Sequence, residues 1–274
     1  MMAALEVWDQ QTWPSELRAL FDDNFPSLEG FVTEERRIED TRYGPTGWCR
    51  GARARPLNPF QRVHDEVLRR AQELASELSV VGYHCTRLHS DEIDHILSHG
   101  LEPLSKDLFE RRVRARVLAG DISTDVGAGL LADNFVHDEE GTRLGRLFFL
   151  FTADLTRMDD FFSFWGGESL YTTHHGKQEM LLPLRTIGVP CIVEAVLPTD
   201  ALCLWSDSMG ERLYEAVLAH WGLREGAPGW EDSVADPVPA DRIRRIIRLG
   251  DPVFARLTDC AAWSESELLS RWAI

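Results

Sequence analysis

The spacing of apolar residues predicts two helices near the start of the chain. Residues 60–78 place apolar side chains at helical spacing, which predicts an amphipathic helix packed on a core. Another helix is expected to begin at residues 13–16, because Trp-Pro-Ser-Glu is typical of a helix start. The glycines and prolines of residues 41–60 predict an irregular connection between the two.

The rest of the chain mixes strands and helices. Residues 79–88 and 189–198 predict two strands. Ser90 is the expected N-cap of a helix that ends at Gly100. Residues 106–134, with a run of arginines inside, are expected to form one helical stretch. Further strands are predicted within 145–155 and 238–251, and further helices at 207–221 and 264–274.

This order of elements favours an α+β fold over a doubly wound sheet, because the helices do not alternate regularly with the strands. At about 150 residues per domain, 274 residues suggest one large domain or two small ones. We therefore divide the chain into a helical N-terminal extension, residues 1–78, and a domain of strands and helices, residues 79–274.

The charge balance narrows the classes of partner. The chain has 29 Lys and Arg residues against 45 Asp and Glu residues, which gives a formal net charge of −16. Broad nucleic-acid binding depends on clustered cations, so this charge argues against it. A local basic pocket for one phosphate-bearing ligand remains compatible with it. The hydrophobic content of 44% is typical of a globular protein and argues against a disordered chain.

The sequence also indicates a compartment. No apolar run reaches the roughly 18–20 residues that span a bilayer, and the N-terminus lacks the basic and apolar regions of a signal peptide. Five scattered cysteines do not form a disulfide framework. The expected location is the cytoplasm, with reduced thiols and no membrane partner.

A short motif at the end of the strand at 79–88 carries a family resemblance. A strand ending in His-x-Thr (His84, Thr86), then a helix, then Gly-Leu, resembles the opening of the ADP-ribosyltransferase fold. The resemblance implies that this strand lines a pocket for NAD, with His84 and Thr86 at the nicotinamide amide and the neighbouring ribose. Arg87 is a candidate for the pyrophosphate because its planar guanidinium binds phosphate oxygens in pairs.

A Leu-Phe-Phe-Leu-Phe segment resembles the central strand of that family, which carries an aromatic side chain stacked on the nicotinamide ring. Strand alternation places Phe149 and Phe151 on one face and Phe148 on the other. The resemblance implies that Phe149, Phe151, Trp165 or Tyr171 supplies the stacking surface. The family more often has Tyr in the strand, and Phe preserves the stacking but not a hydroxyl contact.

The candidate catalytic carboxylate is Glu168, which follows two glycines in an aromatic segment and is expected to open a short strand at 169–171. It resembles the catalytic Glu of ADP-ribosyltransferases, whose carboxylate bonds a ribose hydroxyl and stabilises the positive charge that develops as nicotinamide leaves. Glu179 is the second choice and Glu194 the third, because both lie in apolar runs without the glycines.

The resemblance covers roughly residues 80–255. It implies a small mixed or antiparallel sheet of ADP-ribosyltransferase type. The implied function is a NAD-consuming enzyme that transfers ADP-ribose to an acceptor or hydrolyses NAD, with NAD as co-substrate and no metal. The acidic charge favours a protein or a small molecule as acceptor over bulk nucleic acid.

Two alternatives stay open. The fold could serve as a binding or toxin-immunity module without turnover, since the usual Tyr is replaced. A metal-dependent hydrolase could instead use the histidines at 84, 89, 95 and 99, of which His95 and His99 have the i, i+4 spacing of metal ligands. The chain lacks an H-E-x-x-H motif and cysteine pairs with zinc-finger spacing, so no metal ligand is assigned.

Overall fold

The computed structural model describes residues 4–42, 56–133, 143–156, 158–167, 170, 174, 177–204, 208–226 and 229–259. The chain divides into two compact units. The first comprises residues 1–79 together with 204–228, and the second comprises residues 80–203 together with 229–274. The segment 204–228, which sequence analysis assigned to the part after residue 78, therefore belongs to the first unit.

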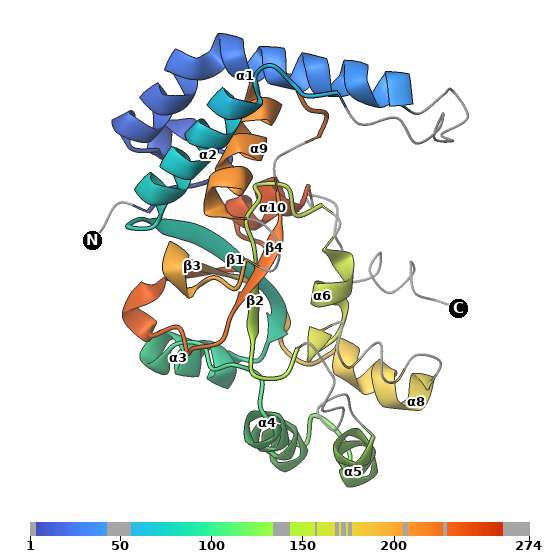
Figure 1. Ribbon diagram of the computed structural model, residues 1–274. Coiled ribbons are helices and arrows are strands. Elements are labelled where there is room, and N and C mark those ends of the chain that lie inside the picture. Colours follow the sequence, from blue (N-terminus) through green and yellow to red (C-terminus); the bar gives the residue numbers. More distant parts are fainter. Residues whose placement is uncertain are drawn as a thin grey trace. The chain divides into compact units, whose positions relative to one another are not determined.

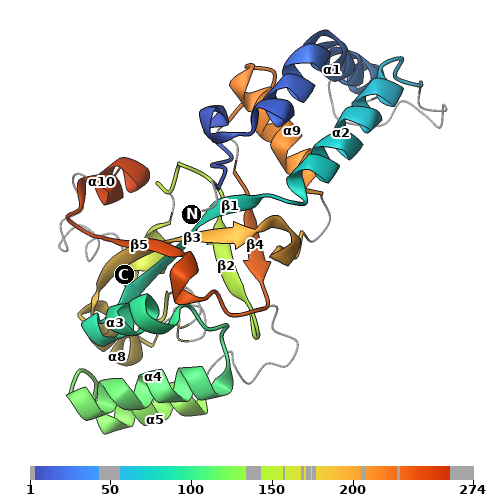
Figure 2. The ribbon, with the colours of Figure 1, turned by 90° about the vertical axis from the view of Figure 1, so that its left-hand side faces the viewer.

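Helices α1 (Ser15–Arg42), α2 (Gln61–Ala75) and α9 (Met209–His220) build the first unit. Helix α2 packs against both α1 and α9, and the three lie side by side in Figure 1 and Figure 2. The predicted amphipathic pattern is confirmed, because Val67, Ala71 and Ala75 are buried along one face of α2. The 3-10 turn η1 (Gln10–Thr12) precedes α1.

A five-stranded sheet forms the centre of the second unit, in the order β4-β2-β1-β3-β5. The pairs β1–β2, β2–β4 and β3–β5 are antiparallel. The predicted α+β fold is thus confirmed. The strands are β1 (Ser79–Leu88), β2 (Leu147–Leu150), β3 (Val189–Pro198), β4 (Glu231–Val234) and β5 (Ile243–Arg248).

The described helices of this unit are α3 (Ser90–His99), α4 (Lys106–Ala119), α5 (Thr124–Ala132), α6 (Asp159–Ser163), α8 (Gln178–Leu181) and α10 (Pro252–Thr258). The 3-10 turns described with them are η3 (Leu182–Arg185), η4 (Thr199–Ala201) and η5 (Ala240–Arg242). Helices α4 and α5 lie side by side (Figure 2). Among the helices in the described part of the chain, none combines the length and the apolar composition of a membrane span.

Three local predictions need correction. The helical stretch 106–134 is two helices, because Gly120 adopts a left-handed φ of 80° that ends α4, and the Ser123 side chain then caps α5. The N-cap of α3 is His89 rather than Ser90. Of the strand expected at 169–171, only Leu170 is described, and it is helical. The predicted helix at 264–274 lies outside the described residues.

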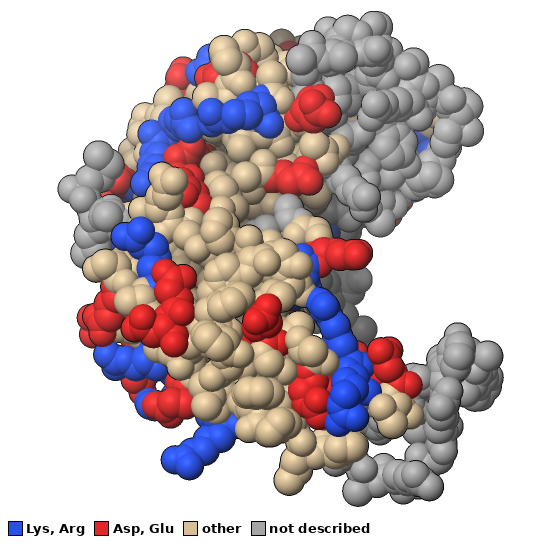
Figure 3. All heavy atoms as spheres, turned by 90° about the horizontal axis from the view of Figure 1, so that it is seen from above, with Lys and Arg blue, Asp and Glu red and all other residues tan. Residues whose placement is uncertain are grey.

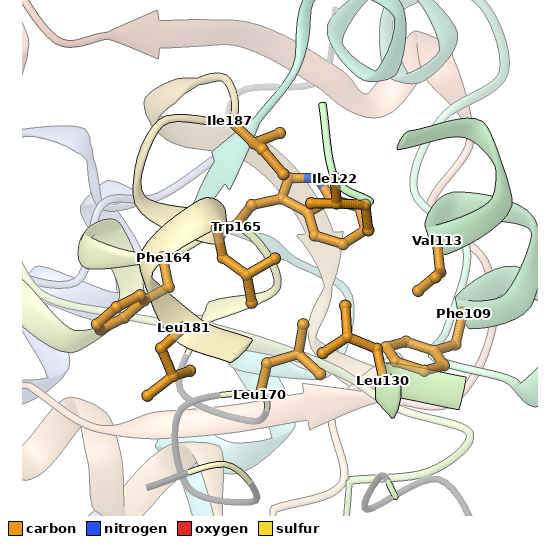
Figure 4. Close-up of a cluster of buried hydrophobic side chains, with 10 residues drawn as sticks. Phe109, Val113, Ile122, Leu130, Phe164, Trp165, Leu170, Leu181 and Ile187 are labelled. Atoms are coloured by element: carbon orange, nitrogen blue, oxygen red, sulfur yellow. The ribbon is translucent and has the colours of Figure 1, made fainter. Parts of the chain in front are cut away.

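Buried apolar side chains in and beside α4 and α5 form one cluster (Figure 4). Trp165 lies near its middle and is 1% exposed. The other members are Phe109, Val113, Ile122, Leu130, Phe164, Leu170, Leu181, Leu184 and Ile187. The cluster joins α4 and α5 to the segment that follows α6, so it fixes the backbone of residues 164–167 against α4.

We expect Gly100→Ala to destabilise the protein far more than Gly120→Ala. Both glycines have positive φ, at 92° and 80°, which costs an alanine about 1–2 kcal/mol. A Cβ on Gly100 would also lie 2.0 Å from the Val238 carbonyl oxygen, whereas nothing lies within 4 Å of a Cβ on Gly120. Urea unfolding should show a loss of about 3 kcal/mol or more for the first variant. Equal losses in the two variants would contradict the close approach.

Candidate functional site

A cavity of about 400 Å³ lies at the end of β1 in the second unit. Its walls come from β1, α3, α4, β2 and residues 161–170, so segments far apart in sequence meet there. The volume is within the range of about 300–1000 Å³ that is usual for small-molecule sites.

Two residues of the predicted NAD motif line this cavity. The half-buried His84 ring places Nδ1 2.9 Å from the Phe148 carbonyl oxygen. Because a carbonyl only accepts, Nδ1 is the protonated nitrogen and Nε2 is left as an acceptor. Burial, together with the positive charge of Arg112, lowers the pKa of His84, so the ring is neutral at physiological pH. Thr86 lines the same cavity and is 9% exposed.

Arg87 is not among the residues that line the cavity. It is 3% exposed, and its guanidinium donates from Nε to the Ile187 carbonyl at 2.7 Å and from Nη1 to the Phe162 carbonyl at 3.3 Å. These bonds tie the end of β1 to two distant backbone segments. Arg87 therefore supports the wall of the cavity, and its role toward a pyrophosphate stays a prediction.

The aromatic surface of the cavity differs from the predicted one. Phe149 and Phe151 are completely buried away from it, with Phe151 stacked on Trp230 at 4.9 Å. Phe148, on the opposite face of the strand by alternation, lines the cavity. The other aromatic lining residues are Phe109, Phe161 and Trp165, and only Trp165 was predicted.

Of the three carboxylates ranked from the sequence, the two that the structure describes, Glu179 and Glu194, do not line this cavity. Glu168 and Tyr171 lie outside the described residues. Glu179 is exposed in the first turn of the short helix α8. Glu194 is buried in β3 and forms ion pairs with Arg244 at 3.3 Å and Arg245 at 2.8 Å.

Glu92, in the first turn of α3, is the carboxylate of the cavity with the most hydrogen bonds, and the sequence analysis did not single it out. Its Oε1 accepts from Arg112 Nε at 2.6 Å, and its Oε2 accepts from Trp165 Nε1 at 2.9 Å and from the His89 backbone N–H at 2.8 Å. Burial alone would raise the pKa of Glu92, but the charge and hydrogen bond of Arg112 outweigh it, so the pKa is lowered. Glu92 is therefore ionised at neutral pH.

The cavity has a local excess of positive charge in an acidic chain. Among the described residues that line it, five are arginines and three are carboxylates. The arginines are Arg111, Arg112, Arg116, Arg143 and Arg146, and the carboxylates are Asp91, Glu92 and Glu102. On the face of the protein in Figure 3, by contrast, basic and acidic side chains are interspersed. A local basic pocket of this kind suits one anionic ligand rather than a nucleic-acid backbone.

Two histidines of α3, His95 and His99, make local contacts. The rings of His95 and His99 stack at 4.5 Å, and His95 Nε2 lies 3.4 Å from Glu102 Oε1. Within the described ranges, no group of three His, Cys, Asp or Glu side chains is placed to hold a metal ion.

In comparisons with known proteins, no protein-family model, no curated protein and no solved structure matches the chain.

We expect Glu92→Gln to lower the free energy of unfolding by about 3 kcal/mol at neutral pH, because it leaves the charge of Arg112 largely buried and unpaired. The matched control is Glu110→Gln, which removes an exposed pair with Arg114 and should cost less than about 1 kcal/mol. Chemical denaturation of both variants measures the difference.

The ion pair of Glu92 and Arg112 also makes the free energy of unfolding depend on pH. The pKa of Glu92 is lowered in the folded protein, so its stabilisation is complete above the unfolded value of about 4.3 and is lost as pH falls through the folded value. The gap in stability between wild type and Glu92→Gln should therefore narrow below about pH 4. A gap that stays constant to lower pH would contradict an ionised Glu92.

Proposed function

We propose that the cavity binds NAD and that the protein consumes it, either by transferring ADP-ribose to an acceptor or by hydrolysing NAD. The observation that carries this proposal is the meeting of His84 and Thr86 with the arginines of α4 around one cavity. The motif that resembles the ADP-ribosyltransferase opening thus shares a cavity with groups suited to phosphate.

The nicotinamide end of NAD would lie against β1. Its carboxamide needs one donor and one acceptor at fixed spacing, which an extended backbone provides. The acceptor Nε2 of His84 and the hydroxyl of Thr86 would form hydrogen bonds with the ribose hydroxyls and the amide. Phe148 or Trp165 would provide the aromatic wall for the ring.

The pyrophosphate would lie against the arginines of α4, in place of Arg87. Arg112 and Arg116 are four residues apart on this helix and both line the cavity, so they lie on the same helical face. The excess of arginine over carboxylate in the lining supports an anionic ligand at this end.

Glu168 remains the proposed catalytic carboxylate. Gly166 and Gly167, which line the cavity with φ of 88° and 64°, come directly before it in the sequence. In the proposed reaction the bond between the ribose anomeric carbon and the nicotinamide nitrogen breaks, and its electron pair leaves with nicotinamide. The acceptor, or water, forms the new bond to that carbon and gives up a proton. A carboxylate nearby would stabilise the positive charge in between.

A binding module without turnover is the second candidate, and one observation favours it. Each described carboxylate of the cavity is paired with an arginine: Asp91 with Arg116, Glu92 with Arg112 and Glu102 with Arg111. None of these three is positioned as a free base or charge stabiliser, so catalysis would depend on Glu168. Calorimetry with NAD and an assay of nicotinamide release separate the two, since a module would bind without release.

The test of the function is incubation with NAD that carries a label on the adenylate. Label in a protein or small-molecule product supports transfer, and label in free ADP-ribose supports hydrolysis. A protein or small molecule is the favoured acceptor, because the acidic chain repels bulk nucleic acid. NAD that stays intact under all conditions would contradict the enzyme proposal.

We expect Glu168→Gln to reduce nicotinamide release by about 100- to 1000-fold, because it removes the charge that opposes the developing cation and keeps the side-chain size. Glu179→Gln, which alters an exposed carboxylate, is the matched control and should keep wild-type activity. If Glu179→Gln were inactive and Glu168→Gln were active, Glu179 would be the catalytic carboxylate instead of Glu168.

We expect His84→Ala and Thr86→Ala to raise KM for NAD while kcat changes little, because both residues would hold the ground-state ligand. A hydrogen bond of this kind is worth roughly 0.5–1.5 kcal/mol, up to about tenfold in KM. Steady-state kinetics of nicotinamide release measure both constants, and the urea midpoint of each variant checks the fold. An unchanged KM in both variants would place the nicotinamide elsewhere.

A further inference from the structure

We propose that Arg112 is the residue that holds a phosphoryl group in the cavity, and that Glu92 and Trp165 position it for this task. The inference rests on the proposed function for the identity of the full ligand, but its own claim concerns the anionic group. It is carried by the contacts of one guanidinium.

Two contacts fix the plane of that guanidinium. Arg112 Nε donates to Glu92 Oε1 at 2.6 Å, and the guanidinium carbon lies 4.9 Å from the centre of the Trp165 ring. The same Glu92 also accepts from Trp165 Nε1 at 2.9 Å, so all three side chains hold one another in place. A planar cation on an aromatic face with one edge bound has little rotational freedom left.

The same guanidinium carries a donor that no described residue uses. Arg112 Nη2 is buried and has no hydrogen-bond partner among the described residues, while Arg112 lines the cavity. Buried donors without a partner are rare in folded proteins because they are costly. A ligand oxygen in the cavity would satisfy this donor.

Arg112 and its neighbour Arg116 each have a buried donor without a partner among the described residues, Nη2 in Arg112 and Nε in Arg116, but they differ in the number of acids that hold them. Arg116 has both terminal nitrogens on carboxylates, Nη1 on Asp121 at 3.0 Å and Nη2 on Asp91 at 2.5 Å. Its charge is therefore balanced by two acids, whereas the charge of Arg112 is balanced by Glu92. Arg112 is the better placed of the two to bind an incoming anion.

The chemistry points to a phosphoryl group rather than to a single carboxylate. The described part of the lining has five arginines against three carboxylates, and this excess of positive charge suits an anion of more than one charge. Arginine binds phosphate oxygens in a planar, directional way that lysine cannot reproduce. The cavity would accordingly retain phosphate-bearing nicotinamide compounds and release nicotinamide riboside, which has no phosphate.

The direct test is calorimetry of the full chain with inorganic pyrophosphate. We expect Arg112→Gln to weaken binding at least tenfold, as for loss of a charge-assisted hydrogen bond. Arg112→Lys should be weakened almost as much, because it keeps the charge and loses the planar fork. The control Arg114→Gln makes the same charge change at an exposed pair on α4 and should bind as wild type does.

A double variant serves as the control for loss of folding. If Arg112→Gln alone unfolds, Glu92→Gln combined with Arg112→Gln removes both charges and keeps two polar groups that can bond each other. This double variant should fold and should not bind pyrophosphate. Retained binding in it would overturn the proposal.

Further results would contradict the inference or separate it from the proposed function. The inference is wrong if wild type does not bind pyrophosphate, if Arg112→Lys binds as wild type does, or if Arg114→Gln is weakened equally. If pyrophosphate binding depends on Arg112 but NAD is neither bound nor consumed, the anion site stands and the proposed function fails. If NAD is consumed with the same KM by Arg112→Gln, the function stands and this inference fails.

Discussion

The candidate site depends on the hydrogen bonds that the Glu92 carboxylate accepts. It accepts hydrogen bonds from the backbone at the start of α3, from Arg112 on α4 and from Trp165 in the segment after α6. Three segments distant in sequence thereby meet at one charge. Because that charge is largely enclosed, it is tolerated only with these donors in place. The positions of α3, α4 and Trp165 around the cavity are therefore linked.

This arrangement explains how an acidic chain can present a site for an anion. The chain carries a formal charge of −16, yet arginines outnumber carboxylates in the lining of the cavity. Carboxylates bind several of these arginines and fix their direction. The site therefore combines positive charge with little conformational freedom of the arginine side chains. Such preorganisation lowers the entropic cost of binding a ligand.

Much of the local structure could be predicted from the sequence. Strands β1 and β3 occupy the predicted residues because β-branched and apolar side chains fill their buried positions. The sequence also predicts that His84 and Thr86 line a pocket at the end of β1, and both line the cavity there. The break of 106–134 into α4 and α5 could have been found from Gly120 and Ser123, a helix stop followed by a cap.

Contacts between distant residues could not be predicted in this way. Arg87 bonds the Ile187 carbonyl, 100 residues away in sequence, and nothing near Arg87 indicates that partner. Alternation separates Phe148 from Phe149, but it does not say which of the two faces borders a cavity. The role of Glu92 likewise depends on Arg112 and Trp165, which only the tertiary fold brings to it.

The central claim is that the cavity between β1, α3 and α4 is the ligand site. Amide hydrogen exchange of the full chain with and without saturating NAD tests it most directly, because bound segments exchange more slowly. The account predicts slower exchange in residues 84–88 and 108–116, with little change in α1 and α2. Slowing confined to α1, α2 and α9, or no slowing anywhere, would contradict it.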